Sequence, residues 1–169
     1  MKKILFVAVL ALASVMAYAQ PRAIGVNLGA SLGFSYQHGF GESNMLDVAV
    51  YTPIASGRAQ LWGLVGTVTY DWIDPFGATV PWNEKGEWHW YMGVGGAGGV
   101  YNFDPCIWTV GVAGHFGIEY DFWFPLQLSL DWRPNIGIVG AAAGGQVGGI
   151  DFNKNGLYDG ITLGVRYKF

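Results

Sequence analysis

The last nine residues of the chain, positions 161–169, alternate strictly between two kinds of side chain. Every odd position from Ile161 to Phe169 is apolar, and the even positions are Thr, Gly, Arg and Lys. Successive side chains of a β-strand point to opposite faces, so the segment predicts a strand with one apolar and one polar face. Such a strand suits either a two-sided soluble sheet or a membrane barrel, and other features decide between them.

The N-terminus carries the features of an export signal. Lys2 and Lys3 give a basic start, positions 4–17 are apolar apart from Ser14, and Ala17-Tyr18-Ala19 is a small-x-small cleavage site. We therefore predict a signal peptide over residues 1–19 and a barrel domain over residues 20–169. The apolar stretch is shorter than the ~18–20 residues that a membrane-spanning helix needs.

The composition favours contact with lipid. Hydrophobic residues make up 51% of the chain and charged residues only 12%, so a soluble sandwich would expose large apolar patches. Without Lys2 and Lys3, seven basic residues (9 − 2) face twelve acidic ones, a net charge of −5. No basic stripe is present to neutralise phosphates, so nucleic acid is not an expected partner. The lone Cys106 excludes an internal disulfide.

The alternation of apolar and polar side chains recurs along the chain. It predicts strands over 24–36, 46–51, 62–72, 88–95, 108–122, 126–133 and 161–169. Composition predicts turns at 38–44, 55–58, 101–105 and 123–125, and loops at 74–86 and 137–156. These are seven strands, whereas single-chain bacterial barrels have even numbers, so we expect eight.

The eighth strand has two candidate sources. Either segment 23–37 bends near Gly29–Gly33 into a hairpin of two short strands, or part of 137–149 supplies another strand. We favour the hairpin, because 23–37 exceeds the ~9–11 residues of one crossing and 137–149 shows no clear lipid-facing row. This choice puts loop 74–86 on the periplasmic side, where turns are normally short.

Aromatic residues gather toward the predicted strand ends. Amphipathic rings prefer the headgroup level of a membrane, so two aromatic girdles are expected. The residues concerned are Trp72, Trp88, Trp90, Tyr120, Phe122, Trp123, Phe124, Trp132, Tyr167 and Phe169.

The polar faces of the strands place charged side chains inside the predicted barrel. An eight-stranded barrel is only wide enough for its own side chains, so diffusion of bulk solutes is not expected. Buried charges must be paired, and we interpret this set as a polar plug that fixes the strand register. Its members are Asp47, His115, Glu119, Asp121, Asp131, Arg133 and Arg166, with Asp71 and Lys168 as further inward positions.

No motif for a catalytic nucleophile is visible. His115 and Glu119 lie four residues apart on one strand, about 13 Å at ~3.3 Å per residue, which is too far for a direct hydrogen bond. We therefore expect no catalytic residues, no cofactor and no enzyme activity.

One loop has the partial spacing of a calcium site. Asp151, Asn153, Asn155 and Asp159, with Gly156, follow the first positions of a calcium loop, but position 12 is Thr162 and the flanks are not helical. Turns rich in Asp and Asn are common without metal, so calcium is the minor alternative.

Three segments resemble the small outer-membrane β-barrels of Gram-negative bacteria, the opacity-protein and outer-membrane-protein-A types, and in particular uncharacterised members. They are GESNMLDV (41–48), PLQLSLDWRP (125–134) and the terminal RYKF (166–169). The resemblance spans essentially the mature chain. It implies contact with outer-membrane lipids and recognition of Val165, Tyr167 and Phe169 by the barrel-assembly machinery. Members of these families include adhesins and membrane-integrity proteins.

We therefore expect an all-β, eight-stranded antiparallel transmembrane β-barrel. Its predicted role is structural, in membrane integrity, or adhesive through surface loops that bind an extracellular ligand or an envelope partner. The alternatives are an enzyme that modifies lipid A, a narrow channel, and a subunit of an envelope secretion or transport complex.

Overall fold

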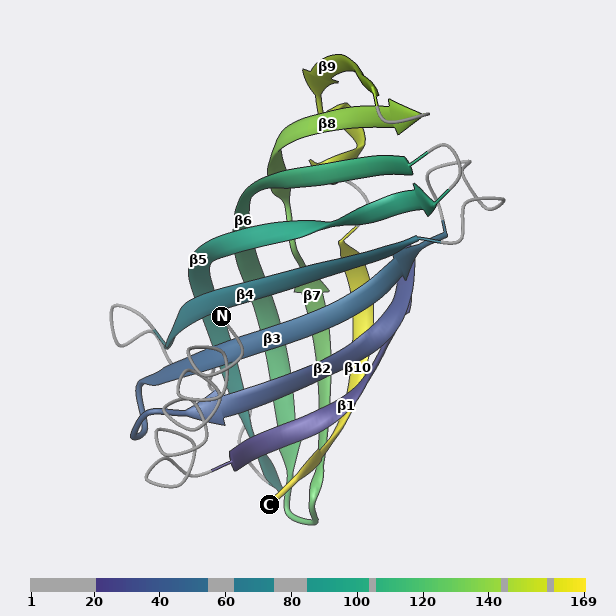
Figure 1. Cartoon of the computed structure of the whole chain (residues 1–169). Helices are drawn as coiled ribbons and strands as arrows, with labels where there is room; N and C mark the ends of the chain where they lie inside the picture. The colour runs from purple at the N-terminus through teal and green to yellow at the C-terminus, as the bar shows by residue number, and fades with distance from the viewer. Residues whose placement is uncertain (1–20, 55–62, 75–84, 104–105, 144–145, 158–159) are drawn as a thin grey trace, which may run out of the picture.

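The computed structural model describes residues 21–54, 63–74, 85–103, 106–143, 146–157 and 160–169 (Figure 1). The predicted signal peptide over 1–19, the predicted turn at 55–58 and position 62 lie outside the described residues. Within the described ranges, no helix is long and apolar enough to cross a membrane.

The described residues form strands and one short 3-10 helix. The elements are β1 (Pro21–Gly29), β2 (Ser31–Gly39), β3 (Asn44–Pro53), β4 (Leu64–Ile73), β5 (Gly86–Phe103), β6 (Cys106–Phe122), β7 (Leu126–Trp132), β8 (Asn135–Ala143), β9 (Gln146–Phe152), η2 (Lys154–Leu157) and β10 (Ile161–Lys168).

Eight of these strands close into an antiparallel barrel (Figure 1). The pairing runs from β1 through β7 in chain order, then to β10, which pairs with β1 again. The first two strands are a tight hairpin about Ala30, with Leu28 opposite Leu32. The predicted closed barrel of eight strands and the predicted bend near Gly29–Gly33 are both confirmed.

The prediction of a loop over 137–149 is wrong, because β8 and β9 occupy most of this segment. Strand β6 is long: Phe116–Asp121 pair with β7, and Cys106–Ala113 pair with β8. β9 pairs with β8, so these two strands extend the sheet beyond the closed barrel. Gly and Ala dominate this segment and fit either face of a sheet, so no alternation of apolar and polar side chains is visible in the sequence. Pairing with β6 makes β8 a strand.

The β5–β6 hairpin is also longer than predicted. The turn expected at 101–105 shrinks, because β5 continues through Phe103 and β6 begins at Cys106. A β-bulge between Val100 and Asn102 lets the strand pairing continue through residues whose composition is typical of a turn. At the other end of β5, Gly86 belongs to the strand, while residues 75–84 of the predicted loop lie outside the described residues.

The barrel has an apolar outside and a polar inside. Along β6, Val112 is 58% exposed whereas the next residue, Ala113, is fully buried. Along β10, Leu163 and Val165 are exposed whereas Arg166 is buried. The predicted facing of the strand residues is confirmed on both elements.

We call the two ends of the barrel the terminal end and the distal end. At the terminal end Phe169 N donates to Arg22 O, and Lys168 N donates to Pro125 O in the β6–β7 turn. β8 and β9 lie at the distal end, at the top of Figure 1, far from the C-terminus. Ring contacts join Trp88, Tyr120, Phe122, Trp123 and Phe124 at the terminal end.

Trp132 lies away from that cluster and packs on Phe116. Among the residues that the structure describes, the predicted girdle residues therefore make most of their ring contacts at the terminal end. The second girdle stays a prediction.

Candidate functional site

Asp131 lies at the centre of a charged network in the barrel interior, or lumen. It points inward from β7 because its neighbours Leu130 and Trp132 take the outer face. Its carboxylate accepts hydrogen bonds from Arg166 Nη2 at 2.7 Å, from Ser129 Oγ at 2.8 Å and from the Tyr91 hydroxyl. Donors from three different strands thus converge on one buried carboxylate.

Arg166 connects the last strand to the first two. Its Nε donates to Ser35 Oγ at 2.9 Å, and its Nη2 donates to Asn27 Oδ1 at 3.3 Å. Arg166 is 1% exposed. A Cβ atom added at Gly25 would lie 2.0 Å from Val165 O and 2.6 Å from Arg166 Cα, so the backbones of β1 and β10 are too close there for a side chain. Closure between β10 and β1 is therefore stabilised by a buried cation as well as by the strand pairing.

Arg133 bridges the lumen from the segment between β7 and β8. Its Nη2 lies 3.2 Å from Asp47 Oδ1 on β3, and its Nη1 lies 3.5 Å from Asp131 Oδ2. Arg133 is 2% exposed and Asp47 fully buried. This pair joins opposite parts of the barrel wall at the point where the chain leaves β7.

His115 lies between two carboxylates. Its Nδ1 is 2.7 Å from Asp71 Oδ2, and its Nε2 is 3.4 Å from Asp131 Oδ1. The ring packs on Tyr91 at a centroid distance of 4.8 Å. His115 is fully buried, so its imidazole is enclosed by protein groups.

Glu119 pairs with Arg22, a residue that the sequence analysis missed. Arg22 is an even-numbered residue of β1, like the outward Ile24, so simple alternation would place it outside. A β-bulge between Pro21 and Ala23 shifts the register and turns Arg22 toward Glu119 and Met45, whose Sδ lies 3.0 Å from Arg22 Nη1. A bulge of this kind leaves no signal in the alternation.

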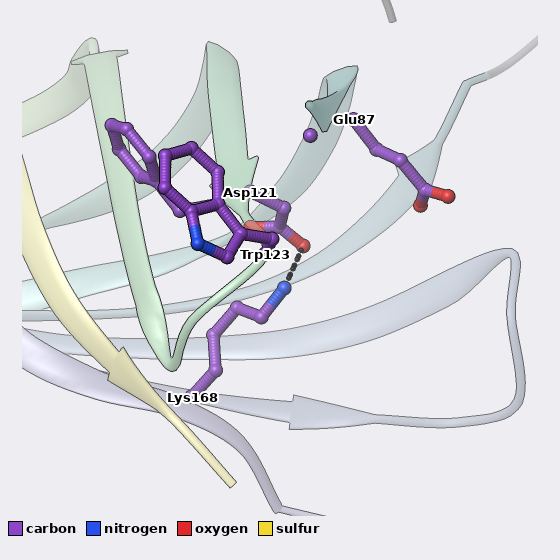
Figure 2. A pocket seen from close by; sticks show the side chains of 6 residues that line it. Glu87, Asp121, Trp123 and Lys168 are labelled. Carbon is purple, nitrogen blue, oxygen red and sulfur yellow. Dashed lines mark ion pairs between the residues drawn. The ribbon is translucent and has the colours of Figure 1, made fainter. Parts of the chain in front are cut away.

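Asp121 and Lys168 pair nearest the terminal end, with Nζ 3.0 Å from Oδ2. They line an open pocket at the rim of the barrel, shown in Figure 2. Among the residues that the structure describes, five inward carboxylates (Asp47, Asp71, Glu119, Asp121, Asp131) face four inward cations (Arg22, Arg133, Arg166, Lys168). The difference, 4 − 5 = −1, is small, and a proton on His115 would cancel it.

An apolar cluster fills the lumen toward the distal end. It consists of Ala49, Tyr51, Val65 and Tyr101. Asn153 lies against it and donates from Nδ2 to the Tyr101 hydroxyl at 3.1 Å and to Thr109 Oγ1 at 3.3 Å. In the described part of the chain, the lumen thus passes from charged groups to an apolar cluster.

The predicted calcium loop is only partly described. Asp151 is exposed on β9 and accepts a hydrogen bond from Phe152 N at 2.7 Å, while Asn153 is buried in the lumen. The side chain of Asn155 and all of Asp159 lie outside the described residues. Among the residues described, no group of three or more His, Cys, Asp or Glu could hold a metal ion.

The predicted assembly residues lie on the outer face of β10. Val165, Tyr167 and Phe169 are 39%, 54% and 64% exposed, and the Tyr167 and Phe169 rings are 5.6 Å apart. Their side chains are therefore available to another molecule at the terminal end of the barrel.

Comparison of the chain with protein-family models, curated proteins and solved structures finds no match. The geometry of the site itself therefore has to carry any functional conclusion. Buried, hydrogen-bonded ion pairs require nearly ideal partners, and losing one partner leaves an uncompensated charge. The network is thus suited to fixing which strands pair and in which register.

Proposed function

We propose that this chain is a non-enzymatic outer-membrane β-barrel protein of the small-barrel type, with a structural or adhesive role. The observation that carries the proposal is the inverted polarity of the barrel. Charged residues that normally face water lie inside, and large apolar residues lie outside.

The size of the apolar exterior supports contact with lipid. Thirty large hydrophobic side chains of the described residues are exposed, including Phe34 at 70% and Leu163 at 60%. Soluble monomers rarely expose contiguous apolar patches larger than a few hundred Å². A closed barrel also pairs the backbone groups of its wall, as the hydrocarbon core of a membrane demands.

The contents of the lumen favour a structural role over transport. Arg166 and Arg133 cross the space between strands, and Tyr51 and Tyr101 fill its distal part. Side chains that fill an eight-stranded barrel leave no room for bulk solutes. The proposed role therefore resides in the barrel as a stable membrane body and in the segments at its distal end, where β8 and β9 extend the sheet.

Cell fractionation tests the location and the role. We expect the protein to partition with the outer membrane and to require detergent for extraction. Recovery as a soluble periplasmic protein would contradict the proposal. Loss of surface adhesion or of membrane integrity on deletion would support the role, whereas stable co-purification with a secretion or transport complex would replace it with that alternative.

A further inference from the structure

An open pocket of about 470 Å³ lies at the terminal end of the barrel (Figure 2). It is formed by the start of β5, the end of β6, the β6–β7 turn and the end of β10. Its lining residues are Gly86, Glu87, Asp121, Phe122, Trp123 and Lys168. The charged groups around Asp131 are buried deeper in the lumen than this pocket.

The charges of the pocket favour an additional positive group. Glu87 and Asp121 are direct cross-strand partners, and like charges in such positions repel each other. Lys168 Nζ lies 3.0 Å from Asp121 Oδ2, but Asp121 Oδ1 is buried and has no hydrogen-bond partner among the described residues. Glu87 has a side chain that is 72% exposed, and its Oε2 lies 3.5 Å from His89 Nε2. The lining of the pocket thus holds two carboxylates and one lysine, and the lysine pairs with Asp121.

The pocket also offers an anion site and an aromatic wall. The ammonium of Lys168 has three donors, and Asp121 is the one ion-pair partner that the structure gives it. Trp123 is 71% exposed, and its ring contacts Phe122 and Phe124 at centroid distances of 6.0 and 5.1 Å. Aromatic faces attract cations, and tryptophan attracts them most strongly.

We propose that the pocket binds the headgroup of a zwitterionic, amine-bearing phospholipid. The ammonium lies against Asp121 and Glu87, the phosphate lies against Lys168, and Trp123 and Phe122 contact the glycerol and the first acyl carbons. This inference rests on the proposed membrane location, because the aromatic rings at the terminal end would place the pocket at the headgroup level.

Binding to the purified chain in a maltoside detergent tests the proposal. The probes are a short-chain phosphatidylethanolamine, the matching phosphatidylglycerol, which lacks the ammonium, and free phosphorylethanolamine. Tryptophan fluorescence and native mass spectrometry report binding. We expect the phosphatidylethanolamine to bind about fivefold more tightly than the phosphatidylglycerol, the effect of about one surface ion pair.

Charge-neutralising variants locate the site. Glu87→Gln and Asp121→Asn should each remove most of this preference, whereas Glu42→Gln, at an exposed position of the β2–β3 turn, should keep it. Equal affinity for both lipids, or a preference that survives both pocket variants, would overturn the proposal. Free phosphorylethanolamine binding as tightly as the lipid would overturn the assignment to a membrane lipid.

Flotation with vesicles separates failure of this inference from failure of the proposed function. A chain that floats with vesicles but shows no headgroup preference contradicts the pocket assignment alone. A chain that does not float contradicts the membrane location, and with it the lipid source of the ligand.

Discussion

Arg166 Nη2 and Asp131 Oδ2 are 2.7 Å apart, and both side chains are buried in the lumen. The two residues lie on adjacent strands, with Arg166 opposite Gln127 and Asp131 opposite Thr162 in the register. Their contact therefore runs diagonally across the β10–β7 pair. Because β10 also pairs with β1, this bond lies next to the seam where the end of the chain meets its beginning.

Replacing Arg166 tests how much this contact contributes to the free energy of unfolding. Arg166→Met should lower the free energy of unfolding by about 3–5 kcal/mol, because it leaves the buried Asp131 carboxylate without its nearest cation. Urea unfolding in lipid vesicles, followed by tryptophan fluorescence, measures the change. The control, Lys85→Gln at an exposed position, should stay within about 0.5 kcal/mol. Similar values for the two variants would contradict a structural role for the network.

Two adjacent residues of β6 test the facing of the strands. Val112→Arg places a cation on the exposed outer face, which costs about 2–4 kcal/mol at the middle of a membrane. Ala113→Ser adds only a hydroxyl to the polar interior. We expect the first change to block folding into lipid vesicles and the second to be tolerated, as judged by gel mobility before and after heating. Equal tolerance of both changes would contradict the facing.

Gly117, on the inner face of β6, and Gly66, on the outer face of β4, test how closely the interior is packed. A Cβ atom at Gly117 would run into the ring of Tyr91, whereas at Gly66 its nearest neighbours would be at an ordinary 3.7 Å. Gly117→Ala should cost about 1–3 kcal/mol through overpacking, and Gly66→Ala should be neutral or slightly stabilising. Unfolding midpoints of the two variants measure this difference. An unchanged midpoint for Gly117→Ala would show that Tyr91 can move aside.

Calcium titration tests the loop that begins at Asp151. Asn153 is buried and its amide donates to Tyr101 and Thr109, so reaching a calcium ion at the surface would break contacts inside the lumen. We therefore expect no shift in thermal stability up to millimolar calcium. A clear stabilisation that Asp151→Ala abolishes would establish the site instead.

The alternation of side chains predicts most of the barrel because the residue type at each position indicates whether it faces outward or inward. Val112, Leu163 and their equivalents are large and apolar, while inward positions such as Asp131 and Arg166 are polar. The closure into eight strands follows from the same pattern, together with the even number that bacterial barrels require.

The remaining features depend on contacts that no local pattern records. β8 and β9 are rich in Gly and Ala, which fit either face, and they form because β6 is long enough to pair with two strands in succession. Arg22 enters the lumen through a bulge that reverses its expected side. Which carboxylate each arginine meets depends on the tilt and closure of the barrel. The charged members of the network other than Arg22 were therefore predictable, and their pairing was not.

We propose that the apolar exterior of this barrel faces lipid. The most direct test is to refold the purified chain with and without detergent or lipid vesicles, and to compare its gel mobility before and after boiling. We expect a compact, heat-modifiable β-barrel that forms only when detergent or lipid is present. A monomeric, folded and freely soluble protein in plain buffer would contradict it.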